Sequence, residues 1–101
     1  MSANNNNDDN TNSKFQLNAK NICLTYPRCP LSITDTLAQL KSIFPTAKYI
    51  ITCSETHEDG GLHVHAGIAL DKACRTRNQH FADIRSGDPG GSIYHPNVQS
   101  A

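Results

Sequence analysis

Two histidines in one short segment have the spacing of metal ligands. His63 and His65 are separated by a single valine within residues 62–70 (LHVHAGIAL), where apolar residues alternate with polar or small ones. Residues two apart in a strand point to the same face, so the two imidazoles would lie about 6.5–7 Å apart along the backbone. Nitrogens at this separation can converge on one cation. The alternative is a pair of solvated histidines on a polar strand face.

Glu55 is the third candidate ligand. Residues 48–54 are rich in β-branched and aromatic side chains and predict a strand, and residues 58–61 (EDGG) predict a turn after it. A hairpin that joins this strand to the next one would bring Glu55 beside His63. A carboxylate with two imidazoles and open positions suits Mg²⁺ or Mn²⁺, which would polarise a phosphate oxygen and orient a phosphodiester for attack. The alternative is that Glu55 only begins a charged turn.

The other three histidines have weaker claims to such a role. His57 lies in the turn, where it is either a further ligand, a group that orients a ligand, or a solvated side chain, and we favour the last. His80 and His95 lack a partner at metal-ligand spacing, so no ligand role is expected for them. Histidine-triad nucleotide hydrolases use H-x-H-x-H on a strand, and Gly67 at the third position argues against that class.

The most clearly marked helix spans residues 33–44. Ser32 is a suitable N-cap with Asp35 three residues later, and Pro45 stops the helix at Phe44. The residues expected to face the core follow helical spacing, and they are Ile33, Leu37, Leu40 and Phe44, with Ala38 and Ile43 widening the stripe.

Strands make up most of the remaining pattern. Residues 15–26 predict a first strand, interrupted near 18–21 and ended by Pro27. Residues 80–86 and 92–99 predict short strands on either side of a glycine-rich turn, the second of them broken by Pro96. The apolar face of strand 62–70 should pack on the helix. This order predicts an α+β fold with a central antiparallel sheet.

The length of the chain leaves room for one domain, and its charge is close to balanced. Residues 1–13 carry no apolar residue after Ala3 and are expected to form a disordered tail, so the domain is placed at 14–101. The formal net charge is zero, and it becomes +2 once Asp8 and Asp9 of the tail are set aside. Three basic residues fall within six positions, and this run is either a DNA-binding cluster or a solvated loop. They are Lys72, Arg75 and Arg77.

The four cysteines form no C-x-x-C pair, so a zinc ribbon is not expected. There is no signal peptide and no apolar run of about 18 residues, so neither secretion nor a membrane is expected. The thiols are then expected to be reduced, in the cytosol or the nucleus. Cys23 and Cys53 fall within predicted strands and are interpreted as small core residues.

Three segments, in order along the chain, carry further motifs. Residues 24–27 read LTYP, residues 55–65 read ETHEDGGLHVH, and residues 81–84 and 94–99 read FADI and YHPNVQ. They resemble, in order and distance, the F-L-T-Y-P motif, the E-x-H-E-[DN]-G…H-L-H motif and the F-H-P-N-[IV]-Q segment of geminivirus replication-associated proteins. The resemblance covers nearly everything from Lys14 to Ala101.

The resemblance implies an RNA-recognition-like HUH endonuclease fold, in which helices flank the central antiparallel sheet. It implies a rolling-circle replication initiator that acts in the host nucleus, binds single-stranded origin DNA and double-stranded origin repeats, and forms homo-oligomers as a full-length protein. In the family a tyrosine nicks one strand and becomes linked to its 5′ phosphate. The implied metal ligands are Glu55, His63 and His65, and the implied DNA-recognition residues are Leu24, Thr25, Tyr26 and Pro27, which join the basic cluster.

The sequence also departs from the family pattern. Cys23 stands where phenylalanine is usual, which is compatible with a divergent virus, a fungal virus or an integrated host copy. The nucleophile motif of the family, Y-x-x-K, follows the P-N-[IV]-Q segment, and none of Tyr26, Tyr49 and Tyr94 has a lysine three residues later. No catalytic residue is therefore assigned, and the chain is expected to bind metal and DNA without nicking. The alternatives are a non-catalytic, sequence-specific DNA-binding module and a structural domain whose histidines have no role.

Overall fold

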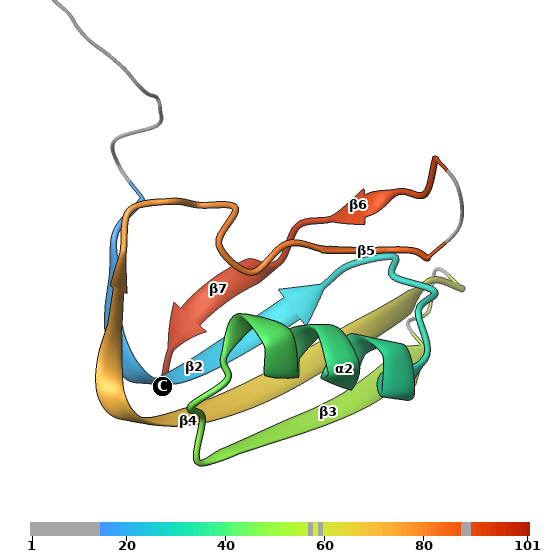
Figure 1. Cartoon of the computed structure of the whole chain (residues 1–101). Coiled ribbons are helices and arrows are strands. Elements are labelled where there is room, and N and C mark those ends of the chain that lie inside the picture. Colours follow the sequence, from blue (N-terminus) through green and yellow to red (C-terminus); the bar gives the residue numbers. More distant parts are fainter. Residues whose placement is uncertain (1–14, 57, 59, 88–89) are drawn as a thin grey trace, which may run out of the picture.

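The architecture is a bent antiparallel sheet with one helix against it. The computed structural model describes residues 15–56, 58, 60–87 and 90–101, so the expected tail and His57 lie outside the described residues. The main sheet has the order β3-β4-β2-β7, and a two-stranded sheet pairs β5 with β6 (Figure 1). The elements are β2 (Leu17–Tyr26), α2 (Ile33–Ile43), β3 (Tyr49–Thr56), β4 (Leu62–Thr76), β5 (Ile84–Arg85), β6 (Ile93–Tyr94) and β7 (Asn97–Ser100). The predicted α+β class with a central antiparallel sheet is confirmed; the described residues contain one flanking helix.

The helix begins and ends as its capping residues predict. Ser32 Oγ accepts a hydrogen bond from the Asp35 backbone N–H at 3.0 Å, and Phe44 is the C-cap ahead of Pro45. The face that it buries is the expected one in part: Leu40 and Phe44 are buried and Ile43 packs against the core. Ile33, however, is 41% exposed, and Ala38 is also exposed. Thr36, which the sequence pattern did not select, is buried one turn before Leu40. The buried residues Thr36 and Leu40 follow i, i+4 spacing along one face of the helix, and Ile33 in the first turn is left in solvent.

The two faces of the sheet have different surroundings. Every second residue of β2 and β4 points to the face that α2 covers, which confirms that the apolar side of strand 62–70 packs in the core. The segment that contains β5 packs against the same core through Ala82 and Ile84. The buried strand residues are Leu17, Ile22, Leu24, Tyr26, Val64, Ala66, Ile68, Ala69 and Leu70. We call the other side of the sheet the open face; among the described residues it carries the alternate side chains, including Thr25, His63 and His65.

The alternation of side chains between the two faces of the sheet corrects the prediction that two cysteines lie in the core. Cys23 and Cys53 do lie in strands, but both are exposed, so their assignment to the core was wrong. Cys23 shares the parity of Thr25, and Cys53 shares that of Glu55, which places both thiols on the open face. Cys29 is the fully buried cysteine of the described residues, and its backbone N–H donates to Leu62 O at 2.9 Å.

β4 is longer than expected and bends. The sequence pattern predicted a strand over 62–70, but pairing continues to Thr76, which lies opposite Leu17. The register shifts between Ala19 and Asn21, within the predicted interruption of the first strand, and both strands turn sharply there (Figure 1). The extension of β4 beyond residue 70 therefore depends on its pairing with β2 near Leu17, and not on alternation of apolar and polar residues within β4 itself.

The C-terminal strands are shorter than expected. β5 and β6 pair over two residues each, and Pro96 separates β6 from β7 as predicted. Part of the glycine-rich turn between β5 and β6 lies outside the described residues. Among the helices of the described chain, none is long and apolar enough to cross a membrane.

Candidate metal and nucleic-acid site

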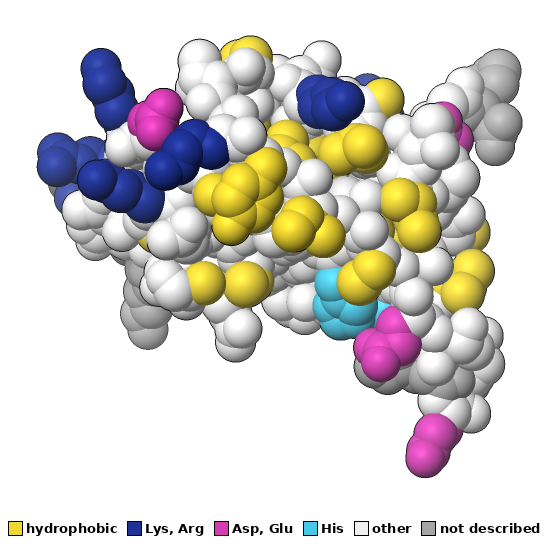
Figure 2. Space-filling view, turned by 90° about the horizontal axis from the view of Figure 1, so that it is seen from below, with side chains coloured by type: hydrophobic (Ala, Val, Ile, Leu, Met, Phe, Trp, Pro, Cys, Tyr) yellow, Lys and Arg dark blue, Asp and Glu magenta, His cyan; other side chains and the backbone are white. Residues whose placement is uncertain are grey.

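The β3–β4 pairing brings the three predicted metal ligands to one end of the open face. Glu55 lies opposite His63 in the register, as the hairpin prediction requires. The His65 Nε2 atom is 3.1 Å from Glu55 Oε1, and both side chains reach solvent, at 36% and 61% exposure. Figure 2 shows histidine and acidic side chains side by side on this face. A solvent-accessible carboxylate and imidazole are therefore already in contact.

His63 occupies a different environment within the same group. It is partly buried, with its Nε2 atom shielded from solvent, and it faces Glu55 across the strand pair. The donor chemistry fits a divalent cation, because one carboxylate and two imidazoles share a strand face with water on one side. Within this group, Glu55 Oε1 and His65 Nε2 are in direct contact.

Thr25 gives His65 a fixed orientation. The two residues are partners in the β2–β4 register, and Thr25 Oγ1 is 3.2 Å from His65 Nδ1. An imidazole that binds a cation through Nε2 keeps its proton on Nδ1, and a hydroxyl oxygen is a suitable acceptor for that proton. Thr25 was predicted from the family motif as a DNA-recognition residue, and its position also makes it a support for a metal ligand.

Replacing Thr25 with valine is expected to weaken Mn²⁺ binding about tenfold, because loss of a hydrogen bond that orients a ligand histidine lowers metal affinity by that order. The β-branched shape is retained, so the strand should be preserved. The measurement is the Mn²⁺ dissociation constant from calorimetry. Thr25→Ser, which keeps the hydroxyl, should bind Mn²⁺ as the wild type does. Equal affinity in the valine and serine variants would contradict the orienting role.

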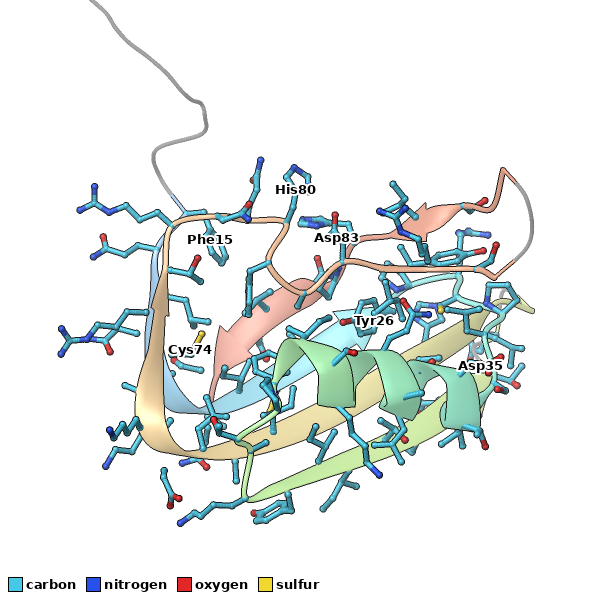
Figure 3. All side chains as sticks on the ribbon, viewed as in Figure 1. Phe15, Tyr26, Asp35, Cys74, His80 and Asp83 are labelled. Atoms are coloured by element: carbon cyan, nitrogen blue, oxygen red, sulfur yellow. The ribbon has the colours of Figure 1, made fainter. Side chains whose placement is uncertain are left out.

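The LTYP segment divides between the core and the surface. Leu24 and Tyr26 are 1% and 0% exposed, so their side chains support the sheet from within, whereas Pro27 is exposed. The Tyr26 hydroxyl donates to Ala82 O at 2.6 Å and ties the β5 segment to the sheet (Figure 3). Burial raises the pKa of Tyr26 above its ordinary value, and the negative charge of Asp83 raises it further.

The predicted basic cluster lies far from the candidate ligands. Arg75 and Arg77 are exposed and line a pocket of about 450 Å³ at the far end of β4, together with Gln16, Leu17, Asn18 and Thr76. Lys72 is exposed nearby in sequence, at the bend. Ten residues separate His65 from Arg75, a path of roughly 30 Å along a strand. Hydrophobic side chains lie between a group of basic side chains and the histidines in Figure 2.

None of the three tyrosines of the chain is placed to attack a phosphate held at Glu55. Tyr26 is buried on the helix-covered side. Tyr49 is on the open face, but six residues before Glu55 on the same strand, or about 20 Å away. Tyr94 lies in β6, outside the main sheet.

A second group of donor atoms was missed. His80, Asp83 and His95 each offer a ligand atom, and these atoms lie within 4.8 Å of one another. The prediction that the two histidines lack a partner at ligand spacing was wrong. The i, i+3 spacing of His80 and Asp83 was the sequence feature that could have indicated this group. His95 joins the group only through the β5–β6 pairing.

The comparison with known families identifies the family of the chain. The family model of the geminivirus Rep catalytic domain matches residues 15–101, and the chain belongs to this family. The family comprises metal-dependent HUH endonucleases that initiate viral rolling-circle replication. Its catalytic domain has the mixed α+β architecture described above.

Proposed function

We propose that residues 15–101 form the origin-recognition and metal-binding part of a rolling-circle replication initiator. Glu55, His63 and His65 hold Mg²⁺ or Mn²⁺ and position a phosphodiester for nicking and rejoining by a tyrosine other than the three present in this chain. The observation that carries the proposal is the contact between His65 Nε2 and Glu55 Oε1 on the open face, within a chain of the Rep family.

The side chains of the site have separate tasks in this proposal. Glu55 supplies the anionic oxygen that a hard cation prefers, and the two imidazoles complete the protein ligands. Thr25 keeps the Nε2 atom of His65 directed at Glu55. A divalent cation, when bound, polarises a phosphodiester oxygen and so favours attack at phosphorus. The open face gives a single strand of DNA access to the group without any movement of α2.

The DNA partners are proposed from the same family membership and from the position of the basic side chains near the end of β4. Single-stranded origin DNA is expected on the open face, and duplex origin repeats against the basic end of β4. Self-association in the full-length protein and action in the host nucleus are parts of the same proposal.

A second candidate function is a sequence-specific DNA-binding module without nicking activity. The positions of Tyr26, Tyr49 and Tyr94 favour it for this chain by itself, because none of them is near Glu55. In that case the chain retains DNA binding and metal binding while origin DNA stays uncut. Incubation of the chain with Mn²⁺ and bound DNA, followed by denaturing electrophoresis, should give no covalent protein–DNA product. Such a product would show that one of the three tyrosines attacks the phosphodiester, and it would contradict both functions.

A selection from a random single-stranded DNA pool tests sequence-specific recognition directly. An initiator should converge on a shared sequence and bind it about 10³-fold or more tightly than a scrambled oligonucleotide at physiological salt. Failure to converge, with equal affinity for all oligonucleotides, would argue for a general binder. Absence of DNA binding altogether would contradict both functions proposed above.

Arg75 and Arg77 are expected to contribute charge rather than sequence information. Replacing both with alanine should weaken binding to every DNA duplex to a similar extent and reduce the slope of log affinity against log salt by about two. Lys41→Ala removes the same type of charge from α2, which covers the other face, and should leave the slope unchanged. Fluorescence anisotropy of labelled DNA across a salt series measures this slope. An unchanged slope in the double variant would place the DNA elsewhere.

A further inference from the structure

The strongest unassigned feature is the group formed by His80, Asp83 and His95, which we call the loop triad. Both imidazoles contact the same carboxylate: His80 Nδ1 is 2.9 Å from Asp83 Oδ2, and His95 Nδ1 is 2.7 Å from Asp83 Oδ1. The two rings are tilted to each other with centroids 5.0 Å apart. Figure 3 shows His80 and Asp83 together on the segment above β2 and β7.

The backbone around the loop triad is held in place from several sides. The His80 N–H donates to Asn78 Oδ1 at 3.0 Å, and the Asp83 N–H donates to His80 O at 3.2 Å. The Tyr26 hydroxyl binds the carbonyl of Ala82, the residue beside Asp83. The backbone at Asp83 is therefore held by contacts that do not involve the imidazoles, and the Asp83 side chain is 19% exposed.

The pairing of the two short strands delivers the third member. Ile84 lies opposite Tyr94, so the residues just outside this pair, Asp83 and His95, come next to each other. The side chains of His80 and His95 are 61% and 47% exposed. The two exposed imidazoles therefore have room to adjust around the less exposed carboxylate.

We propose that the loop triad is a second metal site, which binds Zn²⁺ or a similar nitrogen-preferring cation. Two imidazoles and one carboxylate are a ligand set of zinc sites that keep a fourth, open position. Ligand atoms about 2.1 Å from a tetrahedral metal lie about 3.4 Å from one another. The two imidazoles contact different oxygens of Asp83, and one ligand atom from each of the three residues lies within 4.8 Å of the others. The distances between ligand atoms therefore need to change by about 1.4 Å at most, which the exposed imidazoles permit.

The loop triad is independent of the site at Glu55. Tyr26 points to the helix-covered side of the sheet and reaches Ala82, whereas its neighbour Thr25 contacts His65 on the open face. The two groups therefore lie on opposite sides of the main sheet. A cation at the loop triad would join the segment before β5 to the end of β6, and so close the loop between these strands. Its role is structural.

Zinc binding is tested in a background variant, Glu55→Gln with His65→Asn, so that the site on the open face does not contribute. Chelator-treated background protein should bind one equivalent of Zn²⁺ and gain about 10 °C in Tm at saturating metal. His80→Gln and His95→Gln should each weaken binding at least about 100-fold. Asp71→Asn, an exposed carboxylate outside the loop triad, should bind Zn²⁺ as the background does.

Co²⁺ substitution distinguishes the loop triad from the thiols of the chain. The expected complex shows the intense visible bands of tetrahedral Co²⁺ without a sulfur-to-cobalt charge-transfer band. His80 is exposed, so His80→Gln should fold with an unchanged metal-free Tm, and loss of Zn²⁺ binding would not reflect unfolding. No Zn²⁺ binding in the background variant, undiminished binding in both histidine variants, or a charge-transfer band that disappears on alkylation would each overturn the proposal. The carboxylate would then serve only as a hydrogen-bond acceptor for the two imidazoles.

Discussion

Replacing Glu55 with alanine is expected to remove most of the stabilisation that Mn²⁺ gives the folded protein. At a Mn²⁺ concentration of 100 times the wild-type Kd, binding should stabilise the wild type by about 2.7 kcal/mol. Glu55 provides the charged oxygen of the ligand group, and an affinity about 100-fold weaker in the variant would leave about 0.4 kcal/mol at the same concentration. Thermal or urea unfolding with and without Mn²⁺ measures the difference.

The matched control for this experiment is Glu58→Ala. Glu58 has the same charge, lies three residues later in the turn and is exposed, so its variant should respond to Mn²⁺ as the wild type does. A wild-type response in Glu55→Ala would make the proposed ligand group wrong. Loss of the response in both variants would show that general negative charge near the turn, rather than a defined site, attracts the cation.

The other large effect is expected for Tyr26→Phe. The hydroxyl of Tyr26 is fully buried and donates to Ala82 O at 2.6 Å, so its removal leaves a carbonyl without this donor. The free energy of unfolding should fall by about 1–3 kcal/mol. Urea unfolding near neutral pH measures it. Tyr49→Phe removes the same group from a residue that is 57% exposed and should change stability little.

Tyr26 also predicts how stability depends on pH. Burial, with the charges of Asp83 and Cys29, raises its pKa in the folded protein, so the neutral phenol is favoured by folding. This contribution is complete below the unfolded pKa of about 10 and is lost as pH rises from there toward the folded value. Between pH 10 and 12 the wild type should therefore lose stability more steeply than Tyr26→Phe. Parallel alkaline curves would show that the hydroxyl does not titrate in this way.

The parts of the fold that follow from local rules were predictable. Ser32 and Pro45 mark the helix because capping and proline geometry act within a few residues. The register of Glu55 with His63 follows from a short turn and the two-residue period of strands. The same period, applied to Cys53, would have placed that cysteine on the open face beside Glu55; residue type alone suggested the core.

Features that depend on distant pairing were not predictable. β4 continues to Thr76 because Leu17 pairs with it, and these two residues are 59 positions apart in the sequence. His95 reaches Asp83 through the pairing of two strands of two residues each, too short to leave an alternating pattern. The contact of Thr25 with His65 joins residues 40 positions apart, so the sequence motif that contains Thr25 did not reveal it.

The register that places Cys53 directly opposite His65 also ties the candidate metal site to its redox surroundings. Side chains of directly opposed residues have Cβ atoms about 5 Å apart, and Cys53 is exposed. Oxidation of this thiol to a sulfenic or sulfinic acid would put a new polar group next to the imidazole that faces Glu55. Oxidation would therefore act on the site through a residue that is not itself one of the proposed ligands.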